Sequence, residues 1–238
     1  GTYVGWSWLG GGSASSNSDG SITSSVSAST TAGFSICSWT GNSGTIGHGL
    51  GVKPDVIWIK SRQTANNWVV LHKGLTGGMD ANGIVLNDTA AETSGGSGMA
   101  EPTSSVFTIT SGLAANDNNI GYVFAEKKGY SKFGSYTGNG NADGAFVYTG
   151  FKPAWIMVKR TGGVTNWQIQ DSKRDGFNDQ NKRILANVNE AEKTSQMWDQ
   201  LSNGFKIRVT SENANGSGMS YIYMAFAEAP FVTAGTKA

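Results

Sequence analysis

The chain has two histidines, His48 and His72, and histidine is the side chain that most often acts as a general base or a metal ligand near neutral pH. They lie 24 residues apart (72 − 48), and neither has another histidine or a cysteine at the spacing of a metal site. His48 lies in the turn-like segment GHGLG, and His72 closes the apolar run VVLH. We therefore expect both to be solvated surface groups and predict no metal site.

Carboxylates are the next candidates, because two of them can cleave a glycosidic bond when they stand about 5–10 Å apart. The acidic residues are scattered along the sequence, and no segment has a GxSxG, HExxH, EF-hand or P-loop pattern. Glu126 and Glu228 each close a Phe-Ala-Glu tripeptide, and this repetition indicates a structural role such as bonding to turn amides. We predict that the protein is not an enzyme and needs no cofactor, with a glycan-cleaving enzyme as an alternative.

One loop-like segment combines side chains that suit sugar recognition. SKRDGFNDQNKR contains Arg174, Asp175 and Phe177, and Trp198 lies in another segment without a counterpart elsewhere in the chain. An aromatic ring can stack on the apolar face of a sugar while arginine and aspartate bind its hydroxyls. These four residues are the predicted glycan-binding site. The alternative is that both rings complete the local core.

Three loops resemble calcium loops in composition only, namely SNSDG (16–20), NDNN (116–119) and NGNADG (139–144). Asx turns explain the same composition, so we predict structural turns there. Cys37 is the single cysteine, which excludes an internal disulfide. Because it lies in the apolar run GFSICSW, we expect a buried, inert thiol.

The composition favours an all-β protein. Glycine accounts for 34 of the 238 residues and proline for four, and polar turn residues separate short apolar runs. No long segment has the 3.6-residue periodicity of a helix. The 18 basic and 17 acidic residues leave a net charge of +1, so we expect neither nucleic acid nor membrane insertion. No apolar run approaches the length of a membrane span.

The sequence also repeats itself at a nearly constant offset. The Lys-Pro pairs at 53 and 152 differ by 99 residues, and so do the Asn-Trp pairs at 67 and 166. The Phe-Ala-Glu tripeptides at 124 and 226 differ by 102 residues. Such a pattern indicates duplication of one unit. The tryptophans that lie in the repeated strands are expected to be core residues: Trp58, Trp68, Trp155 and Trp167.

The predicted fold is two tandem repeated antiparallel β-sandwich units, jelly-roll-like, at residues 33–128 and 129–238. DVIWIK and AWIMVK are nearly continuous apolar runs, which is typical of central strands covered on both faces. In the first unit we expect strands near 34–39, 55–61, 67–72, 83–88, 105–110 and 120–126. In the second we expect them near 133–137 or 146–149, then 154–160, 166–171, 182–187, 204–210 and 220–228.

Two further segments have separate expectations. Residues 1–32 should contain the closing strand of an upstream unit, in TYVGWSW, and then a Gly/Ser-rich connector with one weak strand around SITSSVSAS. NEAEKTSQMWDQL (189–201) contains good helix formers and places Met197 and Leu201 four residues apart, so a short surface helix is expected there.

Several long strings resemble a duplicated β-domain in virion proteins of marine and other tailed phages. They are GYSKFGSYTGNGNADGAFVYTGFKPAWIMVKRT, SNGFKIR, YIYMAFAEAPF, DGSITSSVSAS and GHGLGVKPDVIWIK, so the resemblance covers essentially the whole chain. Members of this family look like tail-fibre or other virion structural proteins, without defined catalytic residues. The resemblance therefore implies a structural or adhesive module located in the virion.

Three hypotheses about function follow. The first is a tail-fibre or fibre-like virion module that contacts a host-surface glycan without catalysis. The second is a purely structural virion component, such as a head decoration or a fibre shaft, and the third is a glycan-cleaving enzyme. Other virion proteins and further copies of this chain are the expected partners.

Overall fold

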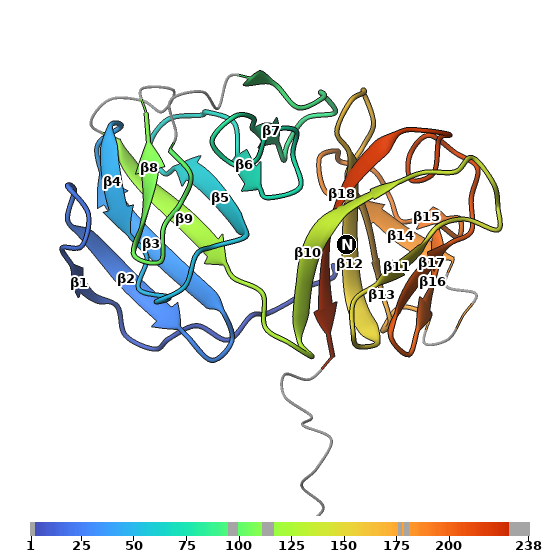
Figure 1. Cartoon of the computed structure of the whole chain (residues 1–238), viewed down its shortest axis with the longest axis horizontal. Helices are drawn as coiled ribbons and strands as arrows, with labels where there is room; N and C mark the ends of the chain where they lie inside the picture. The colour runs from blue at the N-terminus through green and yellow to red at the C-terminus, as the bar shows by residue number, and fades with distance from the viewer. Residues whose placement is uncertain (1–2, 95–99, 111–116, 176–177, 179–180, 229–238) are drawn as a thin grey trace, which may run out of the picture.

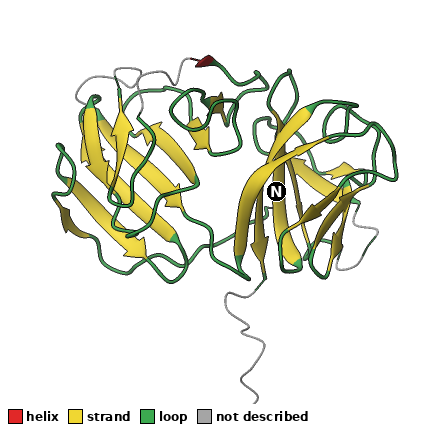
Figure 2. Cartoon of the chain, viewed as in Figure 1, coloured by secondary structure: helices red, strands yellow, loops and turns green. Residues whose placement is uncertain are grey.

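The computed structural model describes residues 3–94, 100–110, 117–175, 178 and 181–228. Within them the chain forms antiparallel β-sheets and no α-helix, which confirms the predicted all-β class. The strands dominate Figure 2, and its short red piece corresponds to a 3₁₀ conformation at Ser94. Figure 1 shows two lobes side by side. We call β1–β9 the N-terminal lobe and β10–β18 the C-terminal lobe.

The N-terminal lobe is a sandwich of two antiparallel sheets. Its large sheet has the strand order β1-β2-β3-β9-β5-β6-β7, and β4 pairs with β8 in the small one. The strands are β1 (Ser15–Asn17), β2 (Ser24–Ser29), β3 (Phe34–Thr40), β4 (Gly44–Gly47), β5 (Val56–Ser61), β6 (Val69–His72), β7 (Ile84–Val85), β8 (Val106–Ile109) and β9 (Asn118–Phe124).

The C-terminal lobe is built in the same way. Its large sheet has the order β10-β18-β12-β13-β14-β15, and the small sheet has the order β11-β17-β16. The strands are β10 (Ser131–Thr137), β11 (Phe146–Tyr148), β12 (Pro153–Arg160), β13 (Gln168–Asp171), β14 (Lys182–Leu185), β15 (Lys193–Thr194), β16 (Trp198–Leu201), β17 (Gly204–Ile207) and β18 (Ser220–Ala227).

The two lobes share one strand order. β3-β9-β5-β6-β7 of the N-terminal lobe corresponds to β10-β18-β12-β13-β14 of the C-terminal lobe, both along the chain and across the sheet. The pair β4–β8 corresponds in the same way to β11–β17. This correspondence follows the offset of the sequence repeat.

The repeated Asn-Trp pairs have matching hydrogen bonds. The Trp68 backbone N–H donates to Asn87 Oδ1 at 2.8 Å, and Asn87 Nδ2 donates to the side-chain oxygen of Asn67. In the C-terminal lobe the Trp167 N–H donates to Asn187 Oδ1 at 2.9 Å, and Asn187 in turn donates to Asn166. An asparagine about 20 residues downstream thus fixes the start of the equivalent strand in each lobe.

Three apolar cores hold the molecule together. Alternate side chains of a strand point to opposite faces, so in β5 Ile57 and Ile59 enter the N-terminal sandwich while Val56 faces the C-terminal lobe. In β12 the inward residues are Ile156 and Val158.

The third core lies between the lobes and includes Phe34, Val56, Val70, Phe124, Phe133, Trp155, Met157, Trp167, Ile222, Met224 and Phe226. Burial on both faces explains the continuous apolar runs of these two strands.

His72 bridges the two lobes from a buried position. Its Nδ1 accepts the backbone N–H of Gly74 at 2.9 Å, so Nε2 carries the proton and donates to the Tyr223 carbonyl oxygen at 3.1 Å. His48 is also buried and has the same arrangement, with Nδ1 accepting from Leu50 and Nε2 lying 3.3 Å from the Thr103 carbonyl oxygen. The expectation that both histidines are solvated was therefore wrong, because each side chain satisfies a turn inside the fold.

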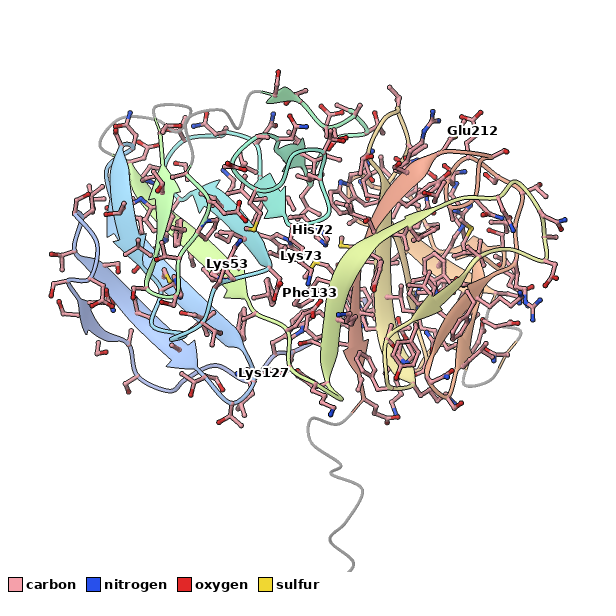
Figure 3. The ribbon with its side chains drawn as sticks, in the orientation of Figure 1. Lys53, His72, Lys73, Lys127, Phe133 and Glu212 are labelled. Carbon is pink, nitrogen blue, oxygen red and sulfur yellow. The ribbon has the colours of Figure 1, made fainter. Side chains whose placement is uncertain are left out.

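Glu126 anchors a charged network at the same junction. Its carboxylate accepts from Lys73 at 2.6 Å, from Lys132 at 2.9 Å and from the Phe133 backbone N–H at 2.8 Å. Figure 3 shows His72, Lys73 and Phe133 between the lobes. Burial alone would raise the pKa of Glu126, but these hydrogen bonds outweigh it and hold the pKa below its ordinary value. The sequence indicated that Glu126 and Glu228 bond to turn amides; Glu126 accepts one backbone N–H, that of Phe133 in β10, whereas Glu228 pairs with Lys173.

Lys159 makes a further contact between the lobes. Its ammonium is buried and donates to the carbonyl oxygens of Arg160 at 2.8 Å, Gly163 at 3.3 Å and Thr89 at 3.2 Å, the last from the N-terminal lobe. Burial, with Arg160 nearby, lowers the pKa of Lys159 to about 8. The lysine therefore stabilises a turn and a lobe contact through carbonyl oxygens.

The strands expected from the sequence are present, with ends shifted by a few residues, but two local expectations were wrong. Residues 189–201 form β15 and β16 in place of a helix, because they pair with β14 and β17. Residues 3–10 form no strand, although TYVGWSW alternates like one. The weak strand expected in the connector is present as β2, which pairs with β3, and β1 adds one more strand beside it.

The two equivalent tryptophans should differ in their contribution to stability. Trp167 is buried and its indole N–H donates to the Val85 carbonyl oxygen of the other lobe at 2.9 Å, whereas Trp68 is only partly buried and stacks on Tyr122. We expect Trp167→Ala to lower the free energy of unfolding by about 3–5 kcal/mol. Trp68→Ala should cost clearly less in the same denaturant titration, and equal losses would contradict the asymmetry.

Acidification should weaken the fold through His72. Burial lowers its pKa from 6.5 to about 4, so between these values the unfolded chain binds a proton that the folded chain does not. Stability therefore falls as the pH drops through this window, by about 1.4 kcal/mol per pH unit for this group. His72→Gln retains an N–H donor without titrating, so unfolding titrations at several pH values should show a smaller slope for it. An unchanged slope would mean that another group causes the pH dependence of stability, for example His48, whose pKa is also lowered by burial.

Candidate functional site

Arg174 and Asp175, predicted from the sequence, lie directly after β13 and stabilise their own loop. Arg174 Nε donates to Asp171 Oδ2 at 2.8 Å and its Nη1 to Glu192 Oε2 at 3.1 Å. Asp175 accepts the backbone N–H groups of Asn181 at 2.6 Å and Lys182 at 2.7 Å. These contacts fix the loop, and both charged side chains are engaged in it.

Of the two rings of the predicted site, the structure describes only Trp198, and it lies in the core. Trp198 is fully buried in the C-terminal sandwich, where it packs against Phe205 with ring centroids 6.0 Å apart. Neither face of its indole is open to a sugar, so the core alternative describes Trp198 correctly. Phe177 lies outside the described residues.

A different set of aromatic rings forms a cleft next to Arg174. The extended segment Tyr3–Leu9 lies against the ends of β12 and β18 and encloses a cleft of about 390 Å³. Its apolar lining includes Trp6, Trp8 and Trp155. Its polar lining includes Ser7, Asp171, Ser172, Lys173, Arg174 and Glu228.

Trp6 and Trp8 hold the segment in place. Residues two apart in an extended chain point to the same side, and both rings meet Trp155 edge to face, at 6.0 Å and 5.6 Å between centroids. Trp8 also packs on Phe226 at 5.4 Å and on Phe124 at 6.4 Å, and so reaches the core between the lobes. No hydrogen bond joins the backbone of residues 3–10 to another described residue, so ring packing positions this wall of the cleft.

The charges that line the cleft are paired. Arg174 is joined to Asp171, and Lys173 is joined to Glu228 near the surface. Two buried polar atoms of lining residues have no partner in the described part of the chain, the indole nitrogen of Trp155 and the hydroxyl oxygen of Ser172. The cleft itself combines apolar ring surfaces with a polar rim, which suits a small uncharged molecule that has both apolar and hydroxyl-bearing faces.

A second groove adjoins this cleft. It has a volume of about 650 Å³ and shares Val4 and Arg174 with the aromatic cleft. Its other lining includes Tyr3, Lys182 and Glu192. The paired Arg174 side chain therefore lies at the boundary of two connected hollows.

The other chemistry-bearing residues of the sequence have structural roles. Burial raises the pKa of the Cys37 thiol to about 11, so the thiol stays protonated, as expected of an inert core residue. In the loop 139–144, Asn139 and Asn141 each accept the backbone N–H two residues on, which confirms Asx turns. Lys206 Nζ contacts Asp143 Oδ1 at 2.8 Å in that loop. Across the described residues no group of three or more His, Cys, Asp or Glu could hold a metal ion, and no helix there could span a membrane.

Sequence reasoning missed Trp6 and Trp8 as site residues. The signal was present in the alternating aromatics of TYVGWSW, but it was interpreted as a strand with a buried face. Trp155 was correctly expected to be a core residue, and its edge nevertheless lines the cleft.

Comparison with known proteins gives one match. No curated protein and no solved structure matches the chain. A family model matches residues 1–230, nearly the whole sequence. The chain therefore belongs to DUF7483, a family described as a domain of unknown function.

Proposed function

We propose that this protein is a non-catalytic glycan-binding module whose ligand occupies the aromatic cleft. The observation that carries the proposal is the position of Trp6 and Trp8, two partly buried rings on the wall of a hollow that also has a polar rim. Aromatic rings stack on the apolar faces of sugars, and the polar rim then binds their hydroxyls. Arg174 remains part of the proposed site, as the sequence suggested. The proposed stacking rings are now Trp6 and Trp8 in place of Phe177 and Trp198.

The setting that we propose is a phage virion, in which the chain is a tail-fibre or fibre-like module that contacts the host surface. The long sequence strings that resemble virion β-domains support this setting. The architecture agrees with it, because two lobes joined by an apolar core and a charged junction give a rigid support for a surface site.

Two other functions remain as alternatives with separate outcomes. A purely structural virion component would use the same rigid lobes and bind no sugar. A glycan-cleaving enzyme would need two carboxyl groups facing one bond, and Asp171 and Glu228 are the acidic residues that line the cleft. Both of these are ion-paired to cations.

Removal of the Trp6 ring should abolish or strongly weaken sugar binding. Trp6 meets one ring, Trp155, whereas Trp8 meets three, two in the C-terminal lobe and one in the N-terminal lobe, so Trp6→Ala is the variant that disturbs packing less. On an array of bacterial surface glycans, the parent protein should bind one class of glycan, and Trp6→Ala should lose roughly tenfold or more in affinity for it.

Tyr148→Ala provides the matched control. Tyr148 is an aromatic residue on β11 that is 64% exposed and does not line the cleft, so its removal should leave binding unchanged. Binding by Trp6→Ala equal to that of the parent would contradict the site. The absence of any glycan ligand for the parent would favour the structural component, and shortened products from a bound glycan would favour the enzyme.

A further inference from the structure

A second hollow, on the N-terminal lobe, has a different chemistry. It has a volume of about 420 Å³ and lies over β1, β2, β3 and the start of β9. Ser16, Ser25 and Ser38, which all line it, are direct cross-strand neighbours: Ser16 pairs with Ser25 and Ser25 with Ser38. We call these three residues the serine row. Adjacent strands place their hydroxyls about 4.8 Å apart.

The serine row points outward and its hydroxyls are unengaged. Val26 and Cys37 alternate with these serines and lie in the N-terminal core, so the serine side chains take the opposite face. None of the three hydroxyls has a hydrogen-bond partner among the described residues, in contrast to Ser24, whose hydroxyl is buried and donates to the Gly47 carbonyl oxygen. They are therefore available to a ligand.

Arg62 adds a positive charge to this hollow. In the described part of the chain no carboxylate lies within ion-pair distance of its guanidinium, and no acidic residue lines the hollow. The neighbouring carboxylate of Asp117 accepts from the Ser61 hydroxyl at 2.5 Å instead. Arg174 in the aromatic cleft differs, because two carboxylates neutralise it.

The hollow is formed by fixed structure. The Arg62 backbone N–H donates to the Asn118 carbonyl oxygen at 2.8 Å, and the Thr40 hydroxyl donates to Asn118 Oδ1 at 2.8 Å. Beneath them the Asn119 amide donates to the carbonyl oxygens of Gly41 at 2.9 Å and Asp117 at 3.0 Å. These bonds hold the end of β3 and the start of β9 in one geometry, so a ligand meets a preorganised surface.

We propose that this hollow is a second binding site, which takes an acidic sugar. Arg62 would bind the carboxylate of the sugar through charge-assisted hydrogen bonds, and the serine row would bind its ring hydroxyls. Among the described residues the C-terminal lobe has no equivalent, because no counterpart of β1 and β2 pairs beside β10 there. The site is independent of the aromatic cleft and is suited to a charged ligand, whereas the cleft has paired charges.

The experiment uses glucuronate as the probe and the whole chain as the protein. Backbone amide shifts in NMR titrations should move at Arg62, Asn118 and the serine row as glucuronate is added. Neutral glucose should bind roughly tenfold more weakly, because it lacks the carboxylate. Inorganic sulfate should also bind more weakly than glucuronate, because it cannot reach the serine row from Arg62.

Matched variants then test the residues. Arg62→Gln should lose glucuronate affinity by about tenfold, and a double change of Ser25→Ala with Ser38→Ala should weaken glucuronate but not sulfate. Lys152→Gln removes one exposed positive charge outside the hollow and should change nothing. Melting temperatures should match the parent, since Arg62 and Ser25 are exposed.

Three results would overturn the proposal. They are no glucuronate shifts up to its solubility limit, equal binding of glucose and glucuronate, or an equal loss from Lys152→Gln and Arg62→Gln. A fourth result, sulfate binding as tight as that of glucuronate, would reject the sugar as the ligand and indicate a simple anion site. Since Trp6→Ala should bind glucuronate normally, a failure here is distinguishable from a failure of the glycan site in the cleft.

Discussion

The apolar core between the lobes is the constraint on which the rest of the structure depends. Phe124 and Phe226 occupy matching positions near the ends of β9 and β18, and their ring centroids lie 6.0 Å apart. Because both large sheets bury their second face in this core, neither sheet has the polar outer face of an ordinary sandwich there. Separation of the lobes would expose this apolar face, and it would also break the hydrogen bonds that His72 donates to the Tyr223 carbonyl oxygen and Lys159 donates to the Thr89 carbonyl oxygen.

The core between the lobes also creates the aromatic cleft. Trp8 contacts Phe124 from one lobe and Phe226 from the other, so the segment that forms the cleft wall rests on the junction itself. Glycine at 74 allows the lobes to approach closely, because a Cβ there would lie 3.2 Å from the backbone of Gly134 in the other lobe. The site and the stability of the molecule are therefore linked through the same few rings.

Much of the fold could be predicted from the sequence, because alternation and repetition depend on local chemistry. The strands around DVIWIK and AWIMVK follow from their apolar runs, and the Asx turns follow from asparagine spacing. The site was harder to predict, because exposure is decided by contacts distant in sequence. Trp198 is covered by β17 and its neighbours, and His72 is covered by a strand 151 residues further on. The stretch 189–201 has good helix formers, yet pairing with β14 and β17 determines its conformation.

The position of the Trp8 ring against the last strand affects the order in which the chain folds. The ring belongs to the first described residues, while Phe226, on which it packs, belongs to the last strand. As the chain leaves the ribosome, the N-terminal sandwich can form early, but the cleft wall cannot reach its final place until the closing strand has been synthesised. Contacts of such long sequence separation carry a large loop-closure entropy and form slowly. The cleft wall can thus take its final place only after β18 has been synthesised and has joined its sheet.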